Sequence, residues 1–113
     1  MATRQNRYAV GLPSELVARE CAGALHDLRW DLLESSEGRM VAREEVALLC
    51  CHESPIQVEV RVVPLSDDRS EISFEASILG RGPIPSKRLR ERAGGLERQV
   101  LRKVLVAEDK LTV

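Results

Sequence analysis

The chain has 113 residues, of which 43% are hydrophobic and 31% charged, and its formal net charge is −1. This length suits a single domain with one hydrophobic core, and the composition excludes a disordered or fibrous protein. The longest apolar run holds six residues, whereas a membrane span needs about twenty, so we expect a cytoplasmic protein without a membrane partner. The three cysteines show no Cys-x-x-Cys spacing, which predicts reduced thiols.

The N-terminal part of the chain predicts a strand followed by a helix. Residues 1–7 are polar and are expected to be a flexible segment, and a short strand follows from Tyr8 to Leu12. Ser14 is placed to cap a helix from about Glu15 to Arg29. Its apolar face is formed by residues at helical spacing, namely Val17, Cys21, Ala24, Leu25 and Leu28.

The middle of the chain predicts two pairs of strands. A polar cluster at residues 34–38 separates two short strands of a β-hairpin. Residues 44–55 are compatible with strand, helix or loop and stay unassigned. Two longer strands follow at residues 56–62 and 72–78, each with alternating apolar and polar side chains, so they should pair antiparallel with matching apolar faces.

A final helix is expected from Ser86 to about Val106, with residues 107–113 as a C-terminal tail. Its apolar stripe consists of Leu89, Ala93, Leu96, Val100 and Val104. Gly94 and Gly95 lie inside it, and each costs about 1 kcal/mol relative to alanine. The helix should therefore approach another backbone closely there, or be kinked.

The predicted fold is α+β with the element order β-α-β4-α, in which residues 8–106 form one domain and both helices pack on one face of an antiparallel sheet. This order is similar to that of TATA-binding-protein-like and small helix-grip domains. The similarity lies in the element order alone and implies no site residues and no activity.

Charge is distributed unevenly along the chain. Residues 1–80 carry 8 Lys/Arg and 14 Asp/Glu, whereas residues 81–103 carry 8 Lys/Arg and 2 Asp/Glu. A basic face on the last helix predicts an interaction domain that docks an acidic protein surface or a second copy of itself. The residues expected to bind this anionic partner are Arg81, Lys87, Arg88, Arg92, Arg98 and Arg102.

Catalytic and metal-binding patterns are weak, so we expect a protein that is not an enzyme and that uses no cofactor. Neighbours on a helix project about 100° apart, so His26 and Asp27 do not face each other as an acid–base pair. The ligand types in residues 50–53 (Cys-Cys-His-Glu) point alternately to opposite sides of an extended chain and would need a further ligand such as Cys21.

A second hypothesis places a small apolar ligand in a pocket between the sheet and the last helix, where the paired glycines would leave space. Against it, Leu89, Leu96, Ile78 and Phe74 would fill that interior. A third hypothesis is weak binding of nucleic acid or another anion. The sequence has only three aromatic residues for base stacking, which argues against nucleic acid.

Overall fold

The computed structural model describes residues 3–45, 55–78 and 86–111. The unassigned segment 44–55 lies mostly outside them. Within the described residues, no helix is long and apolar enough to cross a membrane. Two helices and five strands follow one another in the order β1 (Thr3–Val10), α1 (Ser14–Asp27), β2 (Trp30–Ser36), β3 (Arg39–Glu44), β4 (Ile56–Ser66), β5 (Arg69–Ile78) and α2 (Ser86–Leu111).

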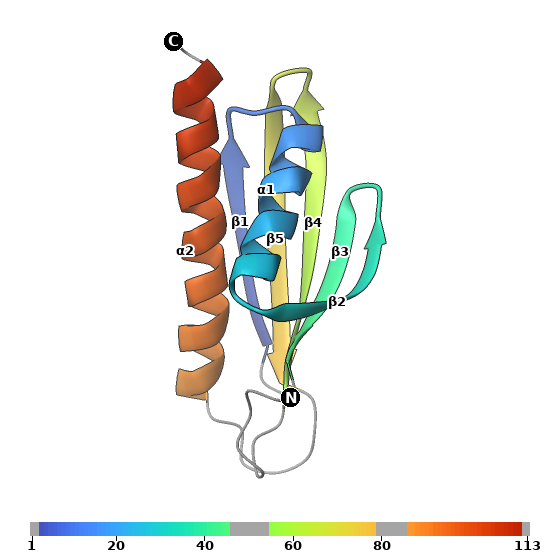
Figure 1. Ribbon diagram of the computed structural model, residues 1–113, viewed down its shortest axis with the longest axis vertical. Helices are drawn as coiled ribbons and strands as arrows, with labels where there is room; N and C mark the ends of the chain where they lie inside the picture. The colour runs from blue at the N-terminus through green and yellow to red at the C-terminus, as the bar shows by residue number, and fades with distance from the viewer. Residues whose placement is uncertain (1–2, 46–54, 79–85, 112–113) are drawn as a thin grey trace.

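The five strands form one antiparallel sheet in the order β1-β5-β4-β3-β2. The first strand therefore pairs with the last one and occupies an edge (Figure 1). The β4–β5 pair matches Val58 with Ala76 and Val60 with Phe74. All four of these side chains are buried, as their alternation predicts.

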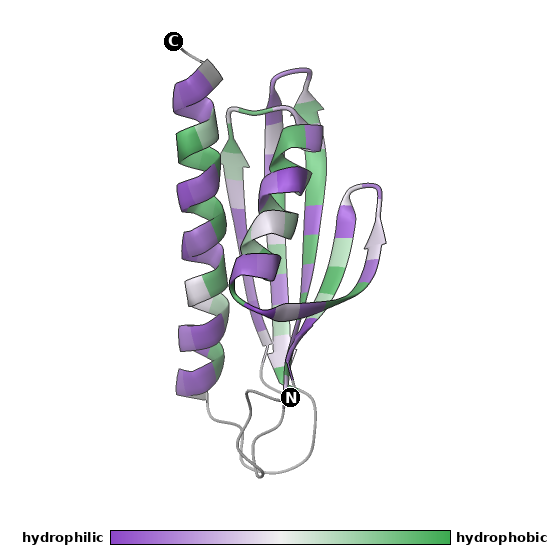
Figure 2. Ribbon diagram, viewed as in Figure 1, coloured by the Kyte–Doolittle hydropathy of each residue, from purple (hydrophilic) through white to green (hydrophobic). Residues whose placement is uncertain are grey.

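Both helices pack on the same face of the sheet, and α2 runs alongside the edge strand β1 (Figure 1). The five residues of the predicted α2 stripe are all at most 3% exposed. Charged residues occupy much of the rest of α2, so polar and apolar bands alternate along it (Figure 2). The predicted α+β fold, with two helices over one face of an antiparallel sheet, is confirmed.

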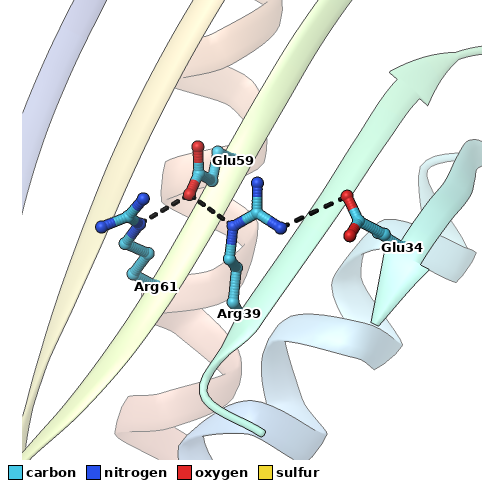
Figure 3. A network of polar contacts seen from close by, with 4 residues as sticks. All are labelled: Glu34, Arg39, Glu59 and Arg61. Atoms are coloured by element: carbon cyan, nitrogen blue, oxygen red, sulfur yellow. Dashed lines mark hydrogen bonds and ion pairs between the residues drawn. The ribbon is translucent and has the colours of Figure 1, made fainter. Parts of the chain in front are cut away.

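The opposite face of the sheet is polar and carries a chain of ion pairs across three strands (Figure 3). Arg39 of β3 donates from Nε to Oε1 of Glu59 at 2.7 Å and approaches Oε2 of Glu34 at 3.2 Å. Arg61 donates to the same oxygen of Glu59. These two guanidinium groups lower the pKa of Glu59, because each donates a hydrogen bond to its charged form.

The hairpin of β2 and β3 has a tighter turn than expected. The turn between β2 and β3 is only Glu37-Gly38. Gly38 has a φ of +76°, and a Cβ there would lie 2.9 Å from the backbone oxygen of Val62. Only glycine fits this turn without strain.

The N-terminal boundaries differ from the sequence prediction. Residues 3–7, expected to be a flexible segment, lie in β1, because Arg4 and Asn6 point inward to a buried carboxylate. Pro13, rather than Ser14, occupies the cap position of α1, and its carbonyl accepts hydrogen bonds from the N–H groups of Leu16 and Val17.

The C-terminal helix also differs from the prediction. It runs to Leu111, so part of the expected tail is helical. It passes through Gly94 and Gly95 as one helix. A Cβ at Gly94 would meet the guanidinium groups of Arg98 at 3.4 Å and Arg4 at 3.6 Å. The space beside this glycine is thus occupied by arginine side chains and not left open.

Candidate functional site

A buried carboxylate joins the middle of α2 to the edge strand β1. Glu97 is only 3% exposed. Its Oε2 accepts a hydrogen bond from Nε of Arg4 at 2.9 Å, and its Oε1 accepts bonds from Nδ2 of Asn6 at 2.7 Å and the hydroxyl of Tyr8 at 3.1 Å. These partners compensate for the loss of hydration, which a buried charge requires. The network fixes how α2 lies against β1.

Beyond this network, a groove of about 440 Å³ runs between β1 and α2, and we call it the β1–α2 groove. Its apolar walls are Tyr8, Ala9, Val10, Leu101, Val104 and Leu105. Arg7 and Glu108 add charge at its rim. Because Tyr8 and Val10 point to the helix side and Arg7 and Ala9 to the other side, the groove follows the free edge of the strand.

Two polar contacts define the length of the β1–α2 groove. Glu97 binds Tyr8 on one side of it, and Oε1 of Glu108 accepts a 2.7 Å hydrogen bond from the N–H of Gly11 on the other. These two glutamates are 11 residues apart along α2, which corresponds to about 16 Å of helix. The apolar residues of α2 that line the groove lie between them.

Tyr8 forms the inner wall of the groove and is held from two sides. Its hydroxyl donates to Glu97, and its ring meets that of Phe74 edge to face at a centroid distance of 5.9 Å. Burial raises the pKa of Tyr8, with the adjacent carboxylate of Glu97 as the next cause. Tyr8 therefore presents a fixed, neutral aromatic surface to the groove.

A second buried carboxylate joins the start of α2 to β3, in the half of the sheet away from β1. Glu44, at the end of β3, is 2% exposed. Its Oε1 accepts hydrogen bonds from the N–H of Ile56 at 2.9 Å and from Nη2 of Arg88, and its Oε2 accepts one from Nε of Arg92 at 2.8 Å. Two of the six arginine and lysine residues predicted to meet a partner thus bind within the molecule.

The other predicted partner-binding residues have different surroundings. Lys87 approaches Glu91 at 3.9 Å on the exposed surface, Arg98 folds against Gly94, and Arg102 lines a groove between the two helices. Arg81 lies outside the described residues. Of the predicted set, the structure thus engages Arg88 and Arg92 within the molecule and leaves Lys87 and Arg102 on the exposed surface.

Of the candidate catalytic and metal residues, the structure describes Cys21, His26 and Asp27. His26 is exposed on α1, and residues 50–53 lie outside the described part of the chain. Cys21 is fully buried, and burial raises the pKa of its thiol to about 12. Within the described residues, no group of three His, Cys, Asp or Glu side chains could hold a metal ion.

The sequence analysis missed both buried glutamates, although each lies at a position of its helix or strand where an apolar residue is expected. Glu97 lies four residues after Ala93 and three before Val100, within the apolar arc of α2. Glu44 continues the inward-facing alternation of Met40 and Ala42 in β3. An acidic residue at an apolar position is the feature that would have marked each of them.

Comparison with known proteins gives a fold but no sequence family. No protein-family model matches the chain, and no curated protein matches it. Among solved structures, it is similar to the ZhuI aromatase/cyclase from Streptomyces sp. R1128, with 14% identity, a TM-score of 0.56, and coverage of 91% of this chain and 93% of that one.

Two further structures show the same similarity. A START superfamily protein from Mycobacterium smegmatis has 10% identity and a TM-score of 0.56, covering 96% of this chain and 98% of that chain. The di-domain aromatase/cyclase BexL from the BE-7585A biosynthetic pathway has 14% identity and a TM-score of 0.61, and 92% of this chain covers 45% of it. The chain has a helix-grip-like fold.

This finding corrects the expectation that the protein is not an enzyme. That expectation rested on the absence of a catalytic sequence motif. The same helix-grip-like fold occurs in structures described as aromatase/cyclases, at 14% identity to this chain. A missing motif thus gives no ground for excluding catalysis in this fold, and the exclusion is wrong.

Proposed function

We propose that this protein binds a small, mostly apolar molecule in the β1–α2 groove. The observation that carries the proposal is the groove itself, about 440 Å³ in volume and lined mainly by apolar or aromatic residues from one strand and one helix. Small-molecule sites are usually concave, largely apolar and roughly 300–1,000 Å³ in volume.

The exposure of the groove wall supports the proposal. Leu105 is 58% exposed, and Leu101 next to it is half-buried. Covering apolar surface contributes about 25 cal/mol per Å², so a ligand that contacts both leucines gains binding free energy there. The charged groups at the rim would orient a polar substituent.

The preorganisation of the groove is a second support. The position of α2 relative to β1 is fixed by Glu97 on one side and by Glu108 on the other. A site whose walls are already in place loses little conformational entropy when a ligand binds. The fold adds that aromatase/cyclases, which by their name act on an organic substrate, share this helix and sheet arrangement.

The proposal is tested by titrating the full chain with Nile red, a neutral apolar dye, and following its fluorescence. We expect saturable binding that Leu105→Arg weakens at least tenfold, because a guanidinium group would then lie in the apolar groove. The matched control is Leu65→Arg, since Leu65 is 53% exposed and lies on β4 outside the groove.

Two results would overturn the proposal. One is the absence of saturable dye binding, and the other is an equal loss in both leucine variants. Native mass spectrometry of freshly purified protein gives an independent readout, because a retained small molecule should be depleted in Leu105→Arg and kept in Leu65→Arg.

A further inference from the structure

A second groove, of about 360 Å³, lies between α1 and α2 on another side of the last helix, and we call it the interhelical groove. Glu20 of α1 faces residues of α2 across it, and α2 contributes Gln99, Arg102, Lys103, Val106, Ala107 and Lys110. Three cations thus meet one carboxylate, which gives this groove an excess of positive charge in a protein whose net charge is −1.

The three cations differ in how they are engaged. Lys103 donates from Nζ to Oδ2 of Asp27 at 2.9 Å and so joins the two helices. This contact lowers the pKa of Asp27 and raises that of Lys103. Among the described residues, neither Arg102 nor Lys110 forms an ion pair. Both are exposed at the groove and available to an anion from outside.

The spacing of these two cations determines what can bind them together. Arg102 and Lys110 are eight residues apart on α2, which corresponds to about 12 Å along the helix. One phosphate or carboxylate group is too small to span this distance. An extended peptide rises about 3.3 Å per residue, so two acidic side chains four residues apart lie about 13 Å apart and on the same face of the strand.

An apolar surface lies between the two cations. Val106 is 54% exposed and Ala107 is half-buried, and both line the interhelical groove. In an extended segment, the residue midway between the two acids points to the same side as they do. An apolar side chain at that position would cover Val106.

From these distances and charges we infer that the interhelical groove docks an extended acidic segment of a partner protein, with two acidic residues four apart and an apolar residue between them. Arg102 and Lys110 bind the two carboxylates, and Val106 contacts the apolar side chain. Glu20 on the opposite wall repels an acidic occupant and keeps it on the α2 side.

The experiment uses the full chain and a fluorescein-labelled peptide containing Glu-Ser-Leu-Ser-Glu, with fluorescence anisotropy measured at low salt. We expect saturable binding that Arg102→Gln and Lys110→Gln each weaken about three- to fivefold, the size expected of one solvent-exposed ion pair. Glu20→Gln should tighten binding. The matched control is Arg90→Gln, which removes an exposed charge from the same helix outside the groove.

Several outcomes would overturn the inference. These are no saturable binding, an equal loss in Arg90→Gln, unchanged binding of the peptide with glutamine in place of both glutamates, or displacement by inorganic phosphate beyond the effect of sodium chloride at equal ionic strength. The last outcome would identify a site for small anions. Nile red is uncharged and targets the β1–α2 groove, so the two proposals can fail separately.

Discussion

Glu97 and Glu44 show how single carboxylates position a whole helix. Each is at most 3% exposed and accepts three hydrogen bonds, which come from β1 for Glu97 and from β4 and α2 for Glu44. A carboxylate in an apolar interior is costly unless it is paired and hydrogen-bonded. These partners lie up to 93 residues away in the sequence, so no local pattern could reveal them.

Replacing Glu97 with alanine should destabilise the protein markedly. Removing one member of a fully buried ion pair costs about 3–5 kcal/mol. We expect about 2–3 kcal/mol here, because the Arg4 side chain keeps 30% exposure and would regain water. Urea denaturation measures the change in the free energy of unfolding. Glu91→Ala on the exposed side of the same helix is the control and should change it by less than about 0.5 kcal/mol; a similar loss in both variants would contradict the role of Glu97.

The ion pairs between Arg39, Glu59 and Arg61 on the polar face predict that the stability of the fold depends on pH. The pKa of Glu59 is lowered by hydrogen bonds from Arg39 and then Arg61. A carboxyl group whose pKa is lower in the folded state stabilises the fold above its unfolded pKa, and this contribution is lost as the pH falls through the folded pKa. We expect Arg39→Gln to raise the pKa of Glu59 towards its ordinary value, as measured by NMR titration. An unchanged titration midpoint would show that Arg39 has no such effect.

At the scale of elements, the alternation and helical spacing of apolar residues predicted most of the strands and helices. The strands β4 and β5 and the apolar stripe of α2 lie where their periods place them, because each buries one face and exposes the other. The strand β1 begins earlier than predicted, because its inward positions are polar and become favourable only through Glu97. In the predicted basic face, Arg88 and Arg92 bind Glu44 within the molecule, which the charge pattern alone did not indicate.

Gly94 and Gly95 of α2 allow the effect of an added methyl group on stability to be compared at two adjacent helix positions. Alanine is favoured over glycine inside a helix by about 1 kcal/mol. A Cβ at Gly95 would meet only Arg98, at 4.0 Å, whereas one at Gly94 would lie closer to Arg98, at 3.4 Å, and would also contact the Arg4 guanidinium that holds Glu97. We expect Gly95→Ala to stabilise the protein by about 0.5–1 kcal/mol and Gly94→Ala by less. Thermal and urea unfolding of both variants measure this order, and a larger gain for Gly94→Ala would contradict it.

At the scale of the whole molecule, the element order led to the fold but not to the functional site. The antiparallel sheet and two helices follow from periodicity alone. The β1–α2 groove depends on the first strand meeting the last helix, which no short segment encodes. Similar structures at 10–14% identity share the fold, so ligand chemistry must be argued from the groove residues of this chain.

Because Cys21 is buried in the core, the rate at which a reagent labels its thiol reports how often the whole protein unfolds. Its side chain is 0% exposed, and burial raises its pKa to about 12, so the reactive thiolate is scarce in the folded state. In a Cys50→Ser, Cys51→Ser variant, the labelling rate of Cys21 by a thiol reagent should rise with urea in parallel with unfolding measured by circular dichroism. Rapid labelling without denaturant would show that α1 opens locally instead.

The placement of β1 at the sheet edge has a consequence for how the chain folds during translation. The ribosome synthesises β1 before its sheet partner β5 and its helix partner α2, with four other elements in between. Until then the earliest strand has no neighbour to bond with, and contacts so distant in sequence form slowly. In the nascent chain, the polar and aromatic side chains of β1 therefore stay exposed until β5 and α2 are synthesised. This is the stage at which chaperones would bind the chain.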